Sequence, residues 1–257
     1  MEGLKDNDLP NVSTDEEFTF TNAIEIDDLG FAFPDGGVVL DHFQATIHRG
    51  ERIGVRGPSG SGKSTLFNLL LGFFPPTAGR ISIDNKELTP SNRRQGHRLA
   101  GYVPQEIFII QGSLAENIAL GRPLVREKIE RVLEQVQLKD WASELPDGMD
   151  TPLGEYGSRL SGGQKQRIGI ARALYKDAEV LFFDEATSAL DSNTEQEINA
   201  ALQELSDTHK ELTMIIIAHR ETSLTFCDRI IELHSNKQKR TKENGERLSD
   251  SGTSHPL

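Results

Sequence analysis

The sequence predicts an α/β fold with a mixed sheet core, in which a parallel sheet adjoins an antiparallel N-terminal β-subdomain. Two continuous apolar runs, Val180–Phe183 and Met214–Ala218, are typical of parallel strands buried on both faces. Segments with helical periodicity alternate with strands, which favours a parallel sheet. Period-two apolar patterns in Ile24–Phe33 and Phe43–His48 instead indicate antiparallel strands with one face in water.

The other expected elements follow from shorter patterns. Ile53–Val55 and Arg80–Asp84 have strand character, and Asn85–Lys86 is an expected turn. The stretch from about 105 to 157 lacks strand patterns, so we expect a helical subdomain inserted there. Helical periodicity predicts helices over Lys63–Leu71, Val125–Val136, Gln164–Tyr175 and Asn193–Leu205.

Polar segments flank this core. Residues 1–22 are acidic and are expected to form a linker. Residues 236–257 contain almost no apolar side chains and are expected to form a disordered tail. The folded domain is therefore predicted to span residues 23–235.

Composition excludes some classes of protein. The net charge of -12 argues against a nucleic-acid-binding protein, because neutralising phosphates requires clustered Lys and Arg. The single cysteine, Cys227, cannot form a disulfide within the chain and suits a reducing compartment. No apolar run approaches the ~20 residues of a membrane-spanning helix. We therefore expect any membrane role to depend on a partner.

The strongest local motif is a glycine-rich loop that fits the pattern G-x-x-x-x-G-K-[ST]. It follows the expected strand at Ile53–Val55 and precedes an expected helix, which is the context that a phosphate-binding loop requires. Lys63 would reach the β- and γ-phosphates of a nucleotide, and the Ser64 hydroxyl would ligate Mg²⁺. By itself the loop predicts a P-loop NTPase. Its predicted nucleotide-binding residues are Gly57, Pro58, Ser59, Gly60, Ser61, Gly62, Lys63, Ser64 and Thr65.

Two carboxylates, Asp184 and Glu185, follow the buried strand Val180–Phe183. Ligands collect at the carboxyl ends of strands in an open parallel sheet, so both side chains should face the phosphate loop. We expect Asp184 to hold Mg²⁺ and Glu185 to act as general base on the attacking water. The alternative is that Asp184 caps a following helix, and both roles can hold together.

The peptide Leu160-Ser161-Gly162-Gly163-Gln164, with the residues that continue to Leu174, resembles the signature sequence of ABC ATPases. The resemblance covers nearly all of residues 23–234, in which the phosphate loop resembles Walker A and Val180–Glu185 resembles Walker B. It implies the P-loop NTPase fold of ABC ATPases, with ATP and Mg²⁺ as cofactors. Contacts to nucleotide are implied for Ser161, Gly162, Gly163 and Gln164.

Four further positions resemble family motifs, and their roles are implied by that resemblance alone. Gln105 matches the Q-loop glutamine that contacts Mg²⁺, and His219 matches the switch histidine that contacts the γ-phosphate. Taken alone, His219 would be a polar residue at the end of a strand. Asp191 matches the D-loop residue that reaches across a dimer. Phe33 holds the place of the usual A-loop Tyr that stacks on adenine, with core packing as the alternative and Phe31 better suited to it.

The resemblance implies a head-to-tail dimer, expected to be a homodimer with two active sites, in which each ATP lies between Walker A of one chain and the signature of the other. Val103–Phe108 and Gly154–Gly157 resemble the Q-loop region and X-loop of exporters, which contact a membrane domain. The apolar cluster Phe108–Ile110 suits either a docking surface or burial within the helical insertion.

The expected function is therefore ATP hydrolysis for an exporter-type ABC transporter at the cytoplasmic face of the cell membrane. A transmembrane permease domain would lie on the same chain, joined through residues 1–22, or on a separate chain. The alternatives are a non-transport ABC ATPase of DNA repair, chromosome structure or translation, and a P-loop kinase, which would not explain the signature peptide.

Overall fold

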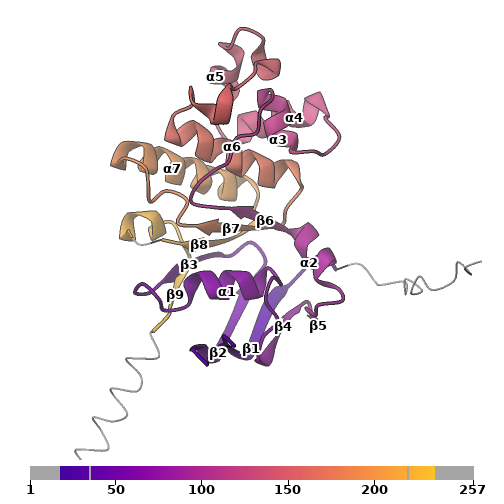
Figure 1. The fold of residues 1–257 in the computed structure, drawn as a ribbon, viewed down its shortest axis with the longest axis vertical. Helices are drawn as coiled ribbons and strands as arrows, with labels where there is room; N and C mark the ends of the chain where they lie inside the picture. Colours follow the sequence, from indigo (N-terminus) through magenta and orange to yellow (C-terminus); the bar gives the residue numbers. More distant parts are fainter. Residues whose placement is uncertain (1–17, 35, 219, 235–257) are drawn as a thin grey trace, which may run out of the picture.

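The computed structural model describes residues 18–34, 36–218 and 220–234, whose strands form an antiparallel and a parallel sheet (Figure 1). The antiparallel sheet has the order β2-β1-β4-β5, and the parallel sheet has the order β6-β7-β8-β3-β9. The antiparallel strands are β1 (Ala23–Ala32), β2 (Val38–His48), β4 (Ala78–Ile83) and β5 (Lys86–Glu87). The parallel strands are β3 (Arg52–Arg56), β6 (Ala100–Val103), β7 (Val180–Asp184), β8 (Thr213–Ile217) and β9 (Arg229–Glu232).

Helices cover both faces of the parallel sheet and form the insertion. They are α1 (Lys63–Leu70), α2 (Arg93–Leu99), α3 (Leu114–Ala119), α4 (Arg126–Gln135), α5 (Lys139–Ser143), α6 (Gly162–Tyr175) and α7 (Ser192–Thr208). Short 3₁₀ turns are η1 (Gly148–Asp150), η2 (Glu155–Gly157) and η3 (Glu221–Leu224). In the part of the chain that the structure describes, no helix combines the length and apolarity needed to cross a bilayer.

The parallel sheet is buried on both faces, because alternate residues of its central strands pack in different core clusters. Leu181 and Phe183 of β7 pack with α6 and α7, whereas Val180 and Phe182 pack with α1 and the antiparallel sheet. Figure 1 shows the same arrangement, with α6 and α7 on one side of the sheet and α1 on the other. Helices α1 and α6 therefore lie on opposite faces.

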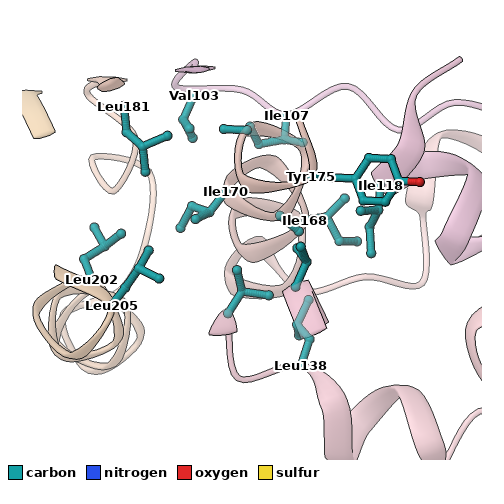
Figure 2. Packing of buried hydrophobic residues seen from close by; sticks show 14 of the residues in the cluster. Val103, Ile107, Ile118, Leu138, Ile168, Ile170, Tyr175, Leu181, Leu202 and Leu205 are labelled. Carbon is teal, nitrogen blue, oxygen red and sulfur yellow. The ribbon is translucent and has the colours of Figure 1, made fainter. Parts of the chain in front are cut away.

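The core cluster on the α6 face joins the sheet to the helical insertion (Figure 2). Buried side chains of α6 pack in one cluster with apolar residues of β7, α7 and α3, so the insertion is anchored by α6. The members labelled in Figure 2 are Val103, Ile107, Ile118, Leu138, Ile168, Ile170, Tyr175, Leu181, Leu202 and Leu205.

Each predicted strand and helix has a counterpart, with differences at the ends. Strand β2 begins at Val38 rather than Phe43, and α6 begins at Gly162 rather than Gln164. The turn lies at Asp84 and Asn85, with left-handed φ values of 47° and 66°, one residue earlier than expected. Strands β5, β6 and β9 and helices α2, α3 and α5 are additional elements, and all of them are short.

The predicted boundary of the folded domain at residue 23 is too late. Phe18 and Phe20 are 4% and 1% exposed, and both belong to the core cluster beneath the antiparallel sheet. Burying two phenyl rings stabilises the fold by several kcal/mol in total, at about 1.5–3 kcal/mol for each. The folded unit therefore includes residues 18–22, while residues 1–17 and the predicted tail at 236–257 lie outside the described residues.

A buried polar cluster joins α3 to α6. The fully buried Asn117 accepts a hydrogen bond from the Ile110 N–H (2.9 Å) and donates to the carbonyls of Ile110 (3.1 Å) and Ser113 (2.9 Å). Arg172 of α6 donates to the Asn117 carbonyl (2.8 Å), the Asn117 side chain (3.0 Å) and the Phe108 carbonyl (2.7 Å). Burial lowers the pKa of Arg172 to about 10, so the guanidinium remains charged at neutral pH.

Replacing Asn117 by Ala should lower the free energy of unfolding by about 2–4 kcal/mol, because buried backbone groups and the Arg172 guanidinium would lose partners. Urea or thermal unfolding of the domain measures this change. The control Gln196→Ala removes an exposed amide from α7 and should change stability by less than about 0.5 kcal/mol. Equal stability of the two variants would contradict a stabilising role for the cluster.

Candidate functional site

The phosphate loop, Gln105 and Asp184 lie where strands end at one edge of the parallel sheet. Because β3, β6, β7 and β8 run parallel, their carboxyl ends meet at the same edge. Gly57 follows β3, Gln105 follows β6 and Asp184 ends β7. His219 comes after β8 in the sequence but lies outside the described residues. Open parallel sheets bind ligands at this edge.

The loop between β3 and α1 requires glycine at two positions. Gly62 has φ 96°, in the left-handed region, and no side chain caps the helix that begins after it. A Cβ atom on Gly57 would lie 2.4 Å from the carbonyl oxygen of Leu233, which is too close for any side chain. The loop tip, residues 58–60, is exposed. The loop therefore leaves backbone N–H groups and an uncapped helix N-terminus available to an anion.

Two side chains of this loop also fit an anion. Lys63 is only 6% exposed, and its Nζ donates hydrogen bonds to the carbonyls of Gly57 (2.9 Å) and Pro58 (3.2 Å). Ser61 is 2% exposed, and its hydroxyl oxygen has no hydrogen-bond partner in the described structure. Buried polar groups are normally partnered, so this hydroxyl suits a ligand oxygen. Ser64 and Thr65 lie in the first turn of α1.

At the end of β7, Asp184 accepts a hydrogen bond from the Tyr102 hydroxyl at 2.9 Å. Burial raises the pKa of Asp184; the Tyr102 hydrogen bond and the Lys63 charge oppose the rise, and the Glu185 charge adds to it. Burial and the Asp184 charge raise the pKa of Tyr102 to about 12, so its hydroxyl keeps the proton that it donates. Because β3 and β7 both pair in parallel with β8, Asp184 lies at the same edge of the sheet as the phosphate loop.

The alternative that Asp184 caps a helix is wrong. Asp184 is the last residue of β7, and the next helix, α7, begins at Ser192 with Asp191 as its cap. Glu185 has a left-handed φ of 52°, which is uncommon for a residue with a side chain. Strained backbone of this kind clusters at functional sites, and it turns the chain sharply at the proposed base.

Two predicted site residues make contacts that the sequence did not reveal. The Gln105 Nε2 donates to the Ser188 hydroxyl at 2.9 Å, which joins the segment after β6 to the segment after β7. Asp191 caps α7 by accepting from the N–H groups of Asn193 and Thr194, both at 3.1 Å, and from the Thr194 hydroxyl at 2.7 Å. The Thr194 side-chain bond leads the contacts that lower the pKa of Asp191. An Asp directly before a periodic apolar segment is a helix-start signal that could have predicted this cap.

The start of α6 forms a capping box. The Ser161 hydroxyl accepts from the Gln164 N–H (3.2 Å), and the Gln164 side chain accepts from the Ser161 N–H (2.9 Å). These two N–H groups are therefore used within the chain. The N–H groups of Gly162 and Gly163 and the Ser161 hydroxyl proton are the donors that α6 can offer to an anion. Gln164 acts here as a capping residue.

An aromatic cluster borders the antiparallel sheet. Phe31 is 7% exposed and stacks on Phe74 with ring centroids 5.5 Å apart, which confirms core packing for Phe31. Phe33 is 40% exposed and meets Phe31 edge-on at 5.1 Å. The exposed ring of Phe33 can take a further flat group, such as an adenine base.

The apolar cluster at residues 108–110, expected to be either a docking surface or buried within the helical insertion, is partly exposed and partly buried. Ile109 is buried at 1% exposure, whereas Phe108 is 62% exposed. Tyr156, in η2, is 71% exposed, and its ring lies 6.1 Å from that of Phe108. These two rings form an exposed aromatic pair on the insertion.

The predicted Mg²⁺ ligands do not form a dedicated cage. Within residues 18–34, 36–218 and 220–234, no group of three or more His, Cys, Asp or Glu side chains is arranged to hold a metal. The candidates are one hydroxyl, one amide and one carboxylate, from Ser64, Gln105 and Asp184. Such a set fits Mg²⁺, which takes few protein oxygens and fills its shell with water and phosphate.

Comparisons with known proteins identify the family of this chain. The ABC transporter family model matches residues 40–188. The ATP-dependent lipid A-core flippase of Ralstonia nicotianae is 44% identical over 204 residues, which are 78% of this chain and 34% of that protein. The protein of the same name from Burkholderia pseudomallei (strain 1710b) is 39% identical over 235 residues, or 90% of this chain and 39% of that protein. A bacterial Atm1-family ABC exporter with ATP bound has a TM-score of 0.76 and 30% identity, covering 97% of this chain and 45% of that chain.

The chain thus spans 34% and 39% of the length of the two flippases. The family match contains the phosphate loop, the signature peptide and the Walker B strand. The chain belongs to the ABC transporter family, as an ATP-binding domain.

Proposed function

We propose that this domain hydrolyses ATP with Mg²⁺ as one half of a head-to-tail dimer, and that the dimer drives the membrane domain of an exporter. The observation that carries the proposal is the placement of two helix starts. The phosphate loop begins α1 on one face of the parallel sheet, and the signature peptide begins α6 on the other face.

A single chain cannot easily bring both helix starts onto one γ-phosphate, because the sheet separates them. A second copy related by a two-fold axis resolves this, since each copy then offers its α6 start to the phosphate loop of the other. The free N–H groups of Gly162 and Gly163 suit that position. ATP then lies between the two copies and holds them together.

Within each site, Lys63 and the loop N–H groups hold the phosphates, while Ser64, Gln105 and Asp184 hold Mg²⁺. When bound, Mg²⁺ neutralises charge on the β- and γ-phosphate oxygens. Glu185 accepts a proton from the attacking water. The left-handed backbone of Glu185 turns the chain directly after Asp184. His219 contacts the γ-phosphate, and Asp191 reaches the partner copy. Phe33 stacks on the adenine.

The membrane domain docks on the helical insertion. The exposed rings of Phe108 and Tyr156 support this, because a large apolar pair on a surface marks an interaction site. Both rings lie in segments that resemble the exporter Q-loop region and X-loop. Relatives named as a flippase and an exporter support transport, and the domain would work at the cytoplasmic face of the membrane.

Replacing Lys63 by Ala should weaken ATP binding by about 10- to 100-fold, because charged hydrogen bonds to phosphate are each worth about 1.5–3 kcal/mol. Equilibrium binding of a fluorescent ATP analogue measures this. Lys139→Ala removes an exposed ammonium from α5 and should leave the affinity unchanged. Unchanged affinity in the Lys63 variant would remove Lys63 from the site.

Replacing Glu185 by Gln should lower turnover by about 10²–10⁴ while ATP still binds, because the amide cannot accept the proton of the attacking water. A dimer should then accumulate with ATP and be visible by size-exclusion chromatography with light scattering. Glu130→Gln makes the same change on the exposed face of α4 and should behave as the unmodified domain. Undiminished turnover would refute Glu185 as the base.

The specific ATPase activity of dilute isolated domain should rise with protein concentration, because each site needs residues from two copies. A dilution series at saturating Mg²⁺ and ATP tests this. A turnover number that stays constant over the whole series would contradict a shared site.

A further inference from the structure

Glu195 is a buried carboxylate that the mechanism above does not use. It lies in the first turn of α7, one turn after the cap Asp191, and its side chain is 3% exposed. A carboxylate buried to this extent is costly unless it is fully paired. Its partners therefore define what it holds in place.

Among the described residues, the side-chain partners of Glu195 come from one short segment that follows β8. Arg220 forms an ion pair with Glu195, and the Ser223 hydroxyl donates to the same carboxylate. The Thr222 hydroxyl donates to it at 3.1 Å. We call Glu195, Arg220, Thr222 and Ser223 the Glu195 cluster. It fixes the first turn of α7 to the chain immediately after the end of β8.

The Glu195 cluster also contacts the segment 187–191, which follows the Walker B strand. Arg220 donates to the Leu190 carbonyl at 3.3 Å. The hydroxyls of Ser223 and Thr187 are hydrogen-bonded at 3.2 Å, and both residues are buried. The carboxyl ends of β7 and β8 are thereby joined through polar side chains, outside the sheet hydrogen bonds.

The same segment supports the start of α6. A Cβ atom on Gly162 would lie 2.7 Å from Leu190 Cδ2, and one on Gly163 would lie 2.7 Å from Thr194 Cγ2. The Leu190 side chain therefore lies against the start of the signature helix, and the Leu190 carbonyl accepts a hydrogen bond from Arg220. Leu190 thus links Arg220 to the start of α6, and packed side chains transmit displacement.

We propose that Glu195 is a positioning residue that fixes segments 187–191 and 220–223 and the start of α6 as one unit. This inference rests on the proposed function. The unit links the catalytic edge of one copy to the groups that this copy offers its partner, namely Asp191 and the α6 start. Without Glu195, ATP still binds to the phosphate loop. The catalytic edge and the groups offered to the partner copy no longer move together.

A purely structural role for Glu195 predicts a different result. Loss of a structural contact would weaken the whole domain, and ATP affinity would fall together with turnover. The positioning role predicts that turnover falls alone, because the Glu195 side chain contacts residues 220–223 and not the phosphate loop, and because α1 packs on the other face of the sheet. Comparing the change in kcat with the change in ATP affinity distinguishes the two roles.

The test compares Glu195→Gln with Glu197→Gln, which makes the same change at an exposed position of the same helix. Glu195→Gln should lower kcat by about 10-fold or more, while the affinity for a fluorescent ATP analogue changes by less than about threefold. Hydrogen–deuterium exchange without nucleotide should become faster in peptides covering both 187–191 and 220–224. Glu197→Gln should match the unmodified domain in all three measurements.

The proposal is overturned by an unchanged kcat, by a parallel loss of ATP affinity, or by faster exchange confined to residues 220–224. Should Glu195→Gln not fold, Thr222→Val removes a single hydrogen bond at an exposed residue and is judged by the same three criteria. If the unmodified domain hydrolyses no ATP, the proposed function fails by itself. The exchange data then decide whether Glu195 joins the two segments, because they require no turnover.

Discussion

The burial of β7 and β8 on both faces is the constraint on which the rest of the structure depends. Their side chains alternate between two cores, so the sheet must carry a helical layer on each side. One layer contains α1 and the phosphate loop, and the other contains α6 and the signature peptide. In the proposed mechanism, this separation leaves each copy with two halves of different sites, one on each face of the sheet. A second copy is then the simplest way to surround a triphosphate.

Local patterns explain what could be predicted from the sequence. Val180–Phe183 and the loop at 57–65 each carry their signal within a few residues, and both were placed correctly. Strands β6 and β9 carry little signal, because each has four residues and lies at an edge of the sheet. The acidic residues at 15–17 dominate the composition before Phe18 and hid the burial of that ring. Boundaries set by composition are weak where one or two large side chains decide burial.

Contacts between distant segments could not be predicted, because no local pattern encodes them. Tyr102 and Asp184 meet only because β6 and β7 pair in register. Glu195, read from the sequence, is a typical first-turn carboxylate favoured by the helix dipole. Its burial depends on the path of the chain after β8, which brings three donors to it. The site therefore contains motif residues that the sequence identifies and supporting residues that only the tertiary structure identifies.

The signature glycines show how the motif residues and the supporting residues depend on each other. Gly162 and Gly163 leave N–H groups free for an anion, and their missing side chains also make room for Leu190 and Thr194. Glycine is thus favoured by packing within the chain, and in the proposed dimer also by the ligand on the partner copy. The packing requirement ties the donors to the segment that follows the Walker B strand. In the proposed dimer, a helix start held in this way would connect the catalytic edge of its own copy to the nucleotide bound by the other copy.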